Sequence, residues 1–316
     1  MANFSASDAA FAGFAFVRRQ PGTVLIWAIA QVVMSVGLFV LVVGPFTPTL
    51  VHLAAVQRQG PDMDPKQAMD SLRLIAPFYG DVFLYVLVLY PILFATINRA
   101  VLRPKESAFG YIRLGGDELR QLGLVLSYVV LGFGAWVVIV IVTAILAVVV
   151  GLLTHAASHN DGLTLLGVVA VYLASIAACI VFGVRLSLAS AQTFATRKLD
   201  IFGSWALTKG RFWSMFGAYL LAGILGVIVT LLGYVIIAAL MVASGGGDEL
   251  LSAFRHPAAN PMTAMSAGGA LLTAPRIIQL VLGGILSAFT LPVTMMPAPT
   301  IYREIAGDAA ASSDVS

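Results

Sequence analysis

The chain has 316 residues, of which 59% are hydrophobic and 10% are charged, and its mean hydropathy is +0.96. A soluble domain normally has about 25% charged residues, so this much apolar surface excludes a water-soluble globular fold. The single cysteine, Cys179, excludes an internal disulfide and a multi-cysteine zinc site. The net charge of +3 does not indicate a nucleic-acid partner, because the basic residues flank apolar segments.

The first apolar segment covers residues 23–43 and follows Arg18 and Arg19. It is longer than the roughly 7–15 residues of a signal-peptide core, and no A-x-A cleavage site follows it, so we expect a retained transmembrane helix. Five more segments reach the length of about 20 residues that a span needs; they cover residues 79–97, 121–153, 164–184, 212–243 and 277–302. The sequence therefore predicts an all-α polytopic membrane protein with six transmembrane helices.

The distribution of Lys and Arg predicts the orientation of these helices. With the N-terminus in the cytoplasm, 13 of the 18 basic residues fall on the cytoplasmic side and five on the outer side. The five are Arg58, Lys66, Arg73, Arg255 and Arg276. This bias favours a multi-pass protein of a bacterial inner membrane with both ends in the cytoplasm.

Aromatic and basic residues precede the first, third and fifth segments, and a glycine or proline closes each stretch. The stretches contain Phe11, Phe14, Arg18 and Arg19; Phe109, Tyr111 and Arg113; and Phe202, Trp205, Lys209 and Arg211. We expect each to form an interfacial "elbow" helix that leads into a transmembrane hairpin, giving three repeated units. The alternative is that the aromatic and basic residues only mark the polar edges of an ordinary multi-span protein.

The elbows supply the candidate lipid-binding residues, because aromatic rings suit the headgroup region and cations attract anionic lipids. The candidates are Arg113, Arg197, Lys198, Trp205, Lys209 and Arg211. We expect Asp200 to cap the third elbow and Gly210 to end it. Arg99 and Arg185 lie at the inner ends of two spans, where their side chains can extend towards water.

The segments between and after the spans have different compositions. In residues 44–78, Asp64 resembles a helix N-cap, and we expect a short surface helix that ends before Pro77. Residues 244–275 are rich in Gly, Ala and Pro and are predicted to be a loop. We expect residues 1–305 to form a single transmembrane domain and residues 306–316 to form a disordered cytoplasmic tail.

Small residues recur at helical spacing in three spans and predict close helix packing. The fourth span contains Ala170, Ala174 and Ala178. The fifth span contains Ser214, Ala218, Ala222 and Gly226, and the sixth contains Gly283 with Ser287 and Gly284 with Ala288. Chance spacing is the alternative, because Ala and Gly are common in this chain.

Prolines in the sixth span indicate irregular backbone, which at membrane depth occurs only against protein or a water-filled cavity. We therefore considered a candidate cavity near Pro292 and Pro297, with Asp81 of the second span as its ionisable residue. A purely structural kink is the alternative for the prolines, and hydration at the outer interface is the alternative for Asp81.

Residues typical of catalysis or metal binding are scarce. His155 and His159 have helical spacing, but no metalloprotease motif surrounds them, and solvated loop residues are the simpler interpretation. The sequence contains no phosphate-binding loop and no nucleophile elbow. We therefore predict no enzymatic activity, no metal and no cofactor.

The stretch from Arg185 to Ala189, together with Ser204-Trp205-Ala-Leu-Thr208-Lys209-Gly210-Arg211-Phe212-Trp213, resembles the membrane domain of bacterial glycerophosphoryl diester phosphodiesterases and of related six-span bacterial proteins. The similarity covers about 30 residues and is moderately specific. It implies the fold and the membrane location but no catalytic residues, because the chain has no segment that could form the catalytic domain.

The leading hypothesis from the sequence is a non-enzymatic inner-membrane protein that acts through contacts with anionic lipids or with a protein partner. The alternative is a small-solute transporter with a cavity near the sixth helix. A third hypothesis is a partner subunit of a phosphodiesterase or an envelope complex. The near absence of ionisable residues in the centres of the spans argues against ion coupling.

Overall fold

A computed structural model describes residues 4–57, 64–158, 161–247, 251 and 274–313. Every regular element in these ranges is a helix. Six helical stretches have the length and hydropathy of membrane spans, which confirms the predicted number. They cover Pro21–Leu50, Met69–Leu102, Ala108–Ala157, Gly162–Thr196, Phe212–Gly245 and Ile277–Gly307. The chain is therefore an integral membrane protein of the all-α class.

Nine helical elements form the main part of the spans. The first contains α2 (Pro21–Leu38), the π-helical turn η1 (Phe39–Val43) and α3 (Gly44–Gln57); the second is α4 (Pro65–Leu102); the third is α5 (Gly116–Ser158); the fourth is α6 (Asp161–Leu186); the fifth contains α9 (Phe212–Met241) and the turn η3 (Val242–Gly246); the sixth is α12 (Ala274–Met295). The 43 residues of α5 extend for about 64 Å, roughly twice the thickness of the hydrocarbon core.

The expected short surface helix before Pro77 is not a separate element. Asp64 does cap a helix, because its side chain accepts a hydrogen bond from the backbone N–H of Lys66 at 3.2 Å. The helix, however, continues through Pro77 and Pro91 to Leu102. A proline removes only one backbone donor, and long membrane helices tolerate that loss.

The proline cluster of the sixth span produces a kink at a single residue. Helix α12 continues through Pro292 to Met295, and α13 (Pro297–Ser313) begins one residue later. The N–H of Met296 donates to the carbonyl of Pro292 at 3.1 Å, and the N–H of Thr300 donates to the carbonyl of Met296 at 3.1 Å. Hydrogen bonding therefore continues across the break, and the irregular backbone is smaller than expected.

The residues after Ile305 are not a disordered tail in the described part of the chain. Helix α13 extends to Ser313. The prediction of disorder was wrong because it weighed the small size and polarity of these residues above helix propensity. Alanine is the strongest helix former, and four alanines occur between residues 306 and 311.

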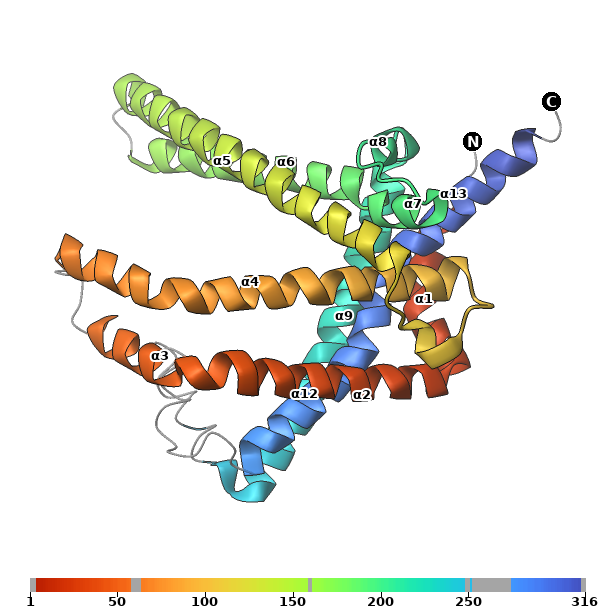
Figure 1. Cartoon of the computed structure of the whole chain (residues 1–316). Coiled ribbons are helices and arrows are strands. Elements are labelled where there is room, and N and C mark those ends of the chain that lie inside the picture. Colours follow the sequence, from red (N-terminus) through yellow and green to blue (C-terminus); the bar gives the residue numbers. More distant parts are fainter. Residues whose placement is uncertain (1–3, 58–63, 159–160, 248–250, 252–273, 314–316) are drawn as a thin grey trace.

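The helices converge at one end of the molecule and fan out from it (Figure 1). We call this the elbow end; it contains α1 (Ala6–Arg19), the 3₁₀ turn η2 (Ala108–Tyr111), α7 (Ala189–Thr196) and α8 (Gly203–Leu207). Only 0% to 22% of the residues in the most apolar window of each span are buried inside the chain. Most of the apolar surface of the spans is thus left for the lipid.

Two pairs of consecutive spans pack against each other. Helix α5 packs along α6, and α9 packs along α12. The first pair differs, because α2 packs mainly along α12, whereas its continuation through η1 and α3 contacts α4. A hydrogen bond of 3.2 Å from the Tyr85 hydroxyl of α4 to the carbonyl of Met34 joins α4 to the last part of α2.

The three elbows also differ from one another. The first is a 14-residue helix, the second is reduced to a turn, and the third combines α7 with the five-residue α8. The Asp200 carboxylate accepts a hydrogen bond of 2.7 Å from the N–H of Gly203 at the start of α8, and Gly210 ends the elbow with a φ of +77°. The Asp200 side chain thus satisfies an N–H of the first turn, although the N-cap residue of α8 is Phe202 and not Asp200 as predicted. Gly210 lies two residues after the C-cap Thr208, in the turn that separates α8 from α9.

Small residues set the closest contacts between the spans. A Cβ added to Gly284 would lie 2.8 Å from the backbone of Val32 in α2, and one added to Gly13 would lie 2.4 Å from the carbonyl oxygen of Pro292. Ala218 and Ala222 of α9 are also buried. The predicted small-residue packing is confirmed at Ala218, Ala222 and Gly226 of α9 and at Gly284 with Ala288 of α12. It is wrong for the fourth span, because Ala170, Ala174 and Ala178 are exposed, and for Ser214, which is exposed as well. Nothing lies within 4 Å of a Cβ added to Gly283.

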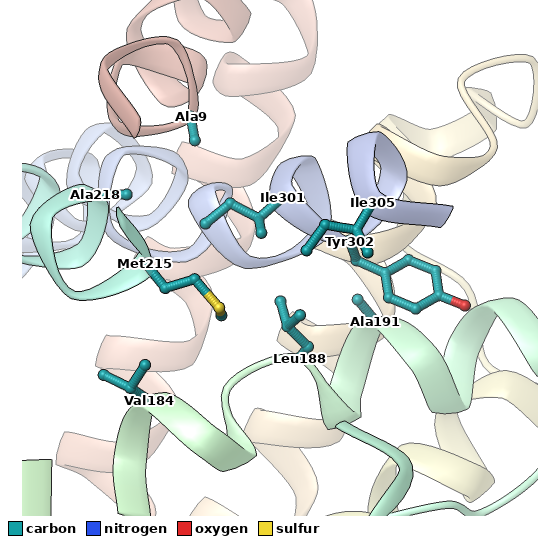
Figure 2. Packing of buried hydrophobic residues seen from close by; sticks show 9 residues of the cluster. All are labelled: Ala9, Val184, Leu188, Ala191, Met215, Ala218, Ile301, Tyr302 and Ile305. Carbon is teal, nitrogen blue, oxygen red and sulfur yellow. The ribbon is translucent and has the colours of Figure 1, made fainter. Parts of the chain in front are cut away.

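The core at the elbow end joins five elements. Figure 2 shows nine buried residues from α1, α6, α7, α9 and α13, together with the α6–α7 connection, and Met215 and Ile301 lie inside the cluster. Both of these side chains are fully buried. The elbow end is therefore the packed part of the molecule.

The neighbouring glycines of α12 allow a direct test of the packing. We expect Gly284→Ala to lower the midpoint of SDS-induced unfolding in mixed micelles, because the new methyl group would meet the α2 backbone. Gly283→Ala is the matched control, since nothing lies within 4 Å of its added Cβ, and it should unfold at or above the wild-type midpoint. Equal midpoints for the two variants would contradict the α2–α12 packing.

Candidate functional site

The strongest electrostatic feature of the elbow end is a buried arginine. The side chain of Arg99, in the last turn of α4, is only 2% exposed. Its Nη2 atom lies 2.7 Å from Oε1 of Glu118 at the start of α5, and its Nη1 donates to the carbonyl of Tyr111 at 2.6 Å. The predicted extension of Arg99 towards water is wrong, because protein carboxylates lie close enough to neutralise the guanidinium inside the fold.

Further ion pairs surround Arg99. The Asp117 carboxylate forms ion pairs with Nη1 of Arg103 at 3.0 Å and with Nη1 of Arg120 at 2.8 Å. Nη1 of Arg113 lies 3.2 Å from the Glu106 carboxylate. We call these residues, with Arg99 and Glu118, the charge cluster. It links the end of α4, the 103–116 loop and the first turn of α5.

The charge cluster continues into α7 through an aromatic ring. The guanidinium of Arg103 lies 4.4 Å from the ring centroid of Phe194, and that of Arg99 lies 5.6 Å away. Arg103 also donates to the carbonyl of Phe194 at 3.2 Å. Because Phe194 is almost fully buried, these cation–π contacts occur away from water, where they are strongest.

A neutral hydrogen-bond network lies beside the charge cluster. The Asn98 amide donates to Oγ of Ser190 at 2.8 Å, that hydroxyl donates to Oε1 of Gln121 at 3.0 Å, and the Gln121 amide donates to the carbonyl of Ser190 at 3.0 Å. All three side chains are buried. The network fixes α4, α5 and α7 relative to one another but leaves no open polar site.

The second elbow is held by aromatic donors. The indole of Trp27 donates to the carbonyl of Gly110 at 2.6 Å, and the Tyr111 hydroxyl lies 3.2 Å from Oε1 of Gln20. Phe109 has a φ of 50°, which is uncommon for a residue with a side chain, and its ring is 83% exposed. The strained turn therefore presents a large aromatic ring at the surface.

Exposed cations and aromatic rings surround the elbow end. We call them the rim; its members are Arg18, Arg19, Lys105, Arg113, Arg197, Lys198 and Lys209, with Phe11, Phe109, Phe202, Trp205 and Trp213. The carboxylates Glu106, Asp117 and Glu118 all point into the charge cluster. Asp8, in the first turn of α1, is an exposed carboxylate at this end, and Glu304 of α13 is partly exposed. The surface of the elbow end is therefore strongly basic.

The third elbow contains a second half-buried arginine. The Nη1 of Arg185, at the end of α6, donates to Oγ1 of Thr208 at 3.3 Å, and its guanidinium lies 5.7 Å from the Trp205 ring centroid. The hydroxyl of Ser204 donates to the carbonyl of Arg185 at 2.8 Å. Among the described residues no carboxylate lies within ion-pair distance of Arg185.

The structure brings most of the predicted lipid-contacting residues to one surface. Arg197, Lys198, Trp205 and Lys209 are exposed in the third elbow. The other two are partly engaged within the protein. Arg113 is exposed but paired with Glu106, and half-buried Arg211 donates to the carbonyl of Leu207 at 3.2 Å.

The candidate cavity residues do not come together. Pro292 and Pro297 are buried, and the backbone of Pro292 lies against Gly13 of α1. Asp81 is exposed on α4 and does not line either of the two best-defined hollows. Helix α1 packs against α12 at Pro292, and Asp81 lies on a different helix, so the structure does not bring these three residues to one site.

The two hollows have mostly apolar walls. One, of about 530 Å³, lies between the outer ends of α9 and α12 and is lined mostly by aliphatic residues such as Leu240 and Ile278. The other, of about 570 Å³, lies between α5 and α6, where the hydroxyls of Thr143 and Ser175 are 2.6 Å apart. Neither contains an ionisable carboxylate or an arginine that could bind a polar solute.

The histidine pair cannot be evaluated, because His159 lies outside the described residues. Within the described part of the chain, no group of three His, Cys, Asp or Glu residues is arranged to hold a metal ion.

The charge cluster was missed by reasoning from the sequence. The available signal was the acidic pair Asp117–Glu118, which follows Gly115–Gly116 directly and begins a helix. The left-handed backbone at Phe109 and Gly110, which turns the loop back towards α4, has no recognisable motif.

No protein-family model, curated protein or solved structure gives a significant match to this chain.

The pairing of Arg99 with Glu118 leads to a stability prediction. Glu118→Gln should destabilise the protein by about 3 kcal/mol, because it leaves a buried guanidinium without its nearest carboxylate. Glu106→Gln should cost less than about 1 kcal/mol, because Glu106 is partly exposed and lies farther from Arg99. Unfolding in SDS mixed micelles measures both values, and equal losses would contradict the dominant role of Glu118.

Proposed function

We propose that this integral membrane protein binds anionic lipid headgroups at the elbow end and has no enzymatic activity of its own. The observation that supports the proposal is the separation of charge in the elbows. Carboxylates pair with arginines inside the fold, whereas rim cations such as Arg197 and Lys198 remain exposed. Each Lys or Arg near an anionic membrane surface contributes about 1 kcal/mol of attraction.

The aromatic residues of the rim suit the same role. Trp213 is 77% exposed at the start of α9, and Phe202 is exposed at the start of α8. Large aromatic rings favour the headgroup region, where the ring meets lipid and its edge meets water. Neighbouring long cationic side chains can extend from that depth to the phosphates.

We also propose that the elbow end faces the cytoplasm of a bacterium and that the protein lies in the inner membrane. The 13 to 5 distribution of basic residues supports this orientation. The resemblance of the Arg185–Trp213 region to phosphodiesterase membrane domains supports the location. It makes a protein partner in the membrane a reasonable second means of action.

Charge reversal tests the lipid contact. We expect Arg18, Arg19, Arg197 and Lys198, all changed to Glu, to reduce phosphatidylglycerol binding about tenfold or more, because four exposed cations are lost. Native mass spectrometry of protein from mixed phosphatidylglycerol and phosphatidylcholine nanodiscs gives the lipid count. Lys66→Glu with Arg73→Glu, at the opposite end of α4, is the control and should retain wild-type binding. Unchanged lipid retention in the fourfold variant would refute the proposal.

The native single cysteine makes the orientation measurable. Cys179 lies within α6, so a membrane-impermeant maleimide should not label the wild type in intact cells. Lys105→Cys, at the elbow end, should be labelled only after the membrane is permeabilised. Ala157→Cys, near the α5–α6 turn, should be labelled in intact cells. The reverse pattern would invert the proposed topology.

A further inference from the structure

Two arginines occupy similar positions in the fold and have different surroundings. Arg99 lies at the end of α4 and Arg185 at the end of α6, and each contacts the elbow that follows its helix. The elbow after α4 supplies Glu106, Asp117 and Glu118 to Arg99. The elbow after α6 supplies a hydroxyl and an indole to Arg185. The protein therefore neutralises the guanidinium of the buried Arg99 but not that of the half-buried Arg185.

The position of Arg185 is fixed by its neighbours. Thr208 is fully buried, and its Oγ1 accepts from Arg185 while donating to the carbonyl of Trp205 at 3.1 Å. The buried Ser204 holds the Arg185 carbonyl, and the indole of Trp205 lies beside the guanidinium. Thr208 thus orients the guanidinium but cannot neutralise its charge.

Most of the hydrogen-bonding capacity of Arg185 is unused. A guanidinium has five N–H donors, and one hydrogen bond, to Thr208, is formed within the described residues. Thr208 is followed directly by the exposed Lys209, and Arg211 comes after the turn at Gly210. The nearest carboxylate in sequence, Asp200, is occupied by the Gln192 amide at 2.9 Å and by the N–H of Gly203. The cations at this junction have no internal anion.

We propose that Arg185 and Lys209 form a binding site for one phosphate-type oxyanion, provided in the membrane by the headgroup of an anionic phospholipid. The inference rests on the proposed lipid contact of the elbow end and adds a defined site to it. The planar fork of Arg185 can donate two parallel hydrogen bonds to a phosphate, and Lys209 can add a point charge. A bound oxyanion would neutralise Arg185 in the way that Glu118 and Asp117 neutralise Arg99.

The surroundings of the site favour a lipid headgroup. Trp205 lies against Phe182 of α6 with 5.5 Å between the ring centroids, and both rings are partly exposed on the lipid-facing side of the fold. A phosphate bound to Arg185 would therefore have apolar surface along α6 beside it, where an acyl chain can lie. Free inorganic phosphate has the same charge chemistry but would not use that surface.

The experiment compares the two sources on the full-length protein. The first arm titrates inorganic phosphate into protein in phosphatidylcholine nanodiscs by calorimetry. The second arm counts phosphatidylglycerol molecules retained in mixed nanodiscs by native mass spectrometry. The variants are Arg185→Gln, Arg185→Lys, Thr208→Val and Thr208→Ser. Arg73→Gln is the matched control, because it removes one exposed arginine that lies on α4 outside the rim.

We expect Arg185→Gln to weaken phosphatidylglycerol binding at its tightest site by about tenfold or more, and the control Arg73→Gln to change it less than about twofold. Arg185→Lys should be intermediate, because it keeps the charge and loses the fork. Thr208→Val should weaken binding and Thr208→Ser should restore it, as expected for a positioning residue. If Arg185→Gln weakens binding of both inorganic phosphate and phosphatidylglycerol, the site binds oxyanions in general. If it weakens binding of phosphatidylglycerol alone, the site is specific for the lipid headgroup.

Wild-type binding by Arg185→Gln in both arms would overturn this inference. If that variant does not purify as a folded protein, wild-type binding by both Arg185→Lys and Thr208→Val would overturn it equally. The proposal for the whole rim has its own test, and it is refuted if the fourfold rim variant binds phosphatidylglycerol as the wild type does. A loss confined to the rim variant would refute the Arg185 site and leave the rim proposal intact.

Discussion

The architecture of the elbow end depends on neutralising Arg99. An arginine that is almost fully buried is stable only where carboxylates and carbonyls surround it, and here they come from Glu118, Asp117 and the carbonyl of Tyr111. Meeting this requirement fixes the start of α5 against the end of α4 and brings the second elbow between them. Phe194 extends the same constraint to α7. The apolar spans, which have little preference for one another over lipid, thereby acquire a defined arrangement at one end.

The sequence predicted the features that depend on local chemistry. Hydropathy located six spans, Asp64 was recognised as a cap, and the small residues around Gly284 indicated close packing. The features that were missed depend on contacts between distant residues. Glu118 meets Arg99 only because the backbone turns at Phe109 and Gly110, and α1 fills the space at Pro292 only because Gly13 lacks a side chain. Pairing of α2 with α12 likewise cannot be read from two apolar segments, since either could pack against any other.

The three elbows use related residues for different purposes. The first is a regular helix whose Gly13 face packs on α12, and the second is a strained turn whose carboxylates serve the interior. In the third, Arg197, Lys198 and Lys209 are exposed and have no ion pair with a described carboxylate. A common sequence pattern of aromatic and basic residues therefore does not imply a common role. The elbows differ in their acidic residues. The second elbow has carboxylates that pair with arginines in the charge cluster, whereas the exposed cations of the third elbow have no such partners among the described residues.

The fan of helices also has a mechanical consequence. The α5–α6 pair is joined to the rest of the described fold mainly near the elbow end, through α4, α7, α8 and the start of α9. A long helix fixed at one end acts as a lever, and a rotation of about 5° at the base of α5 displaces its far tip by about 6 Å. Small rearrangements at the headgroup level would thus be converted into large lateral movements at the opposite side of the bilayer.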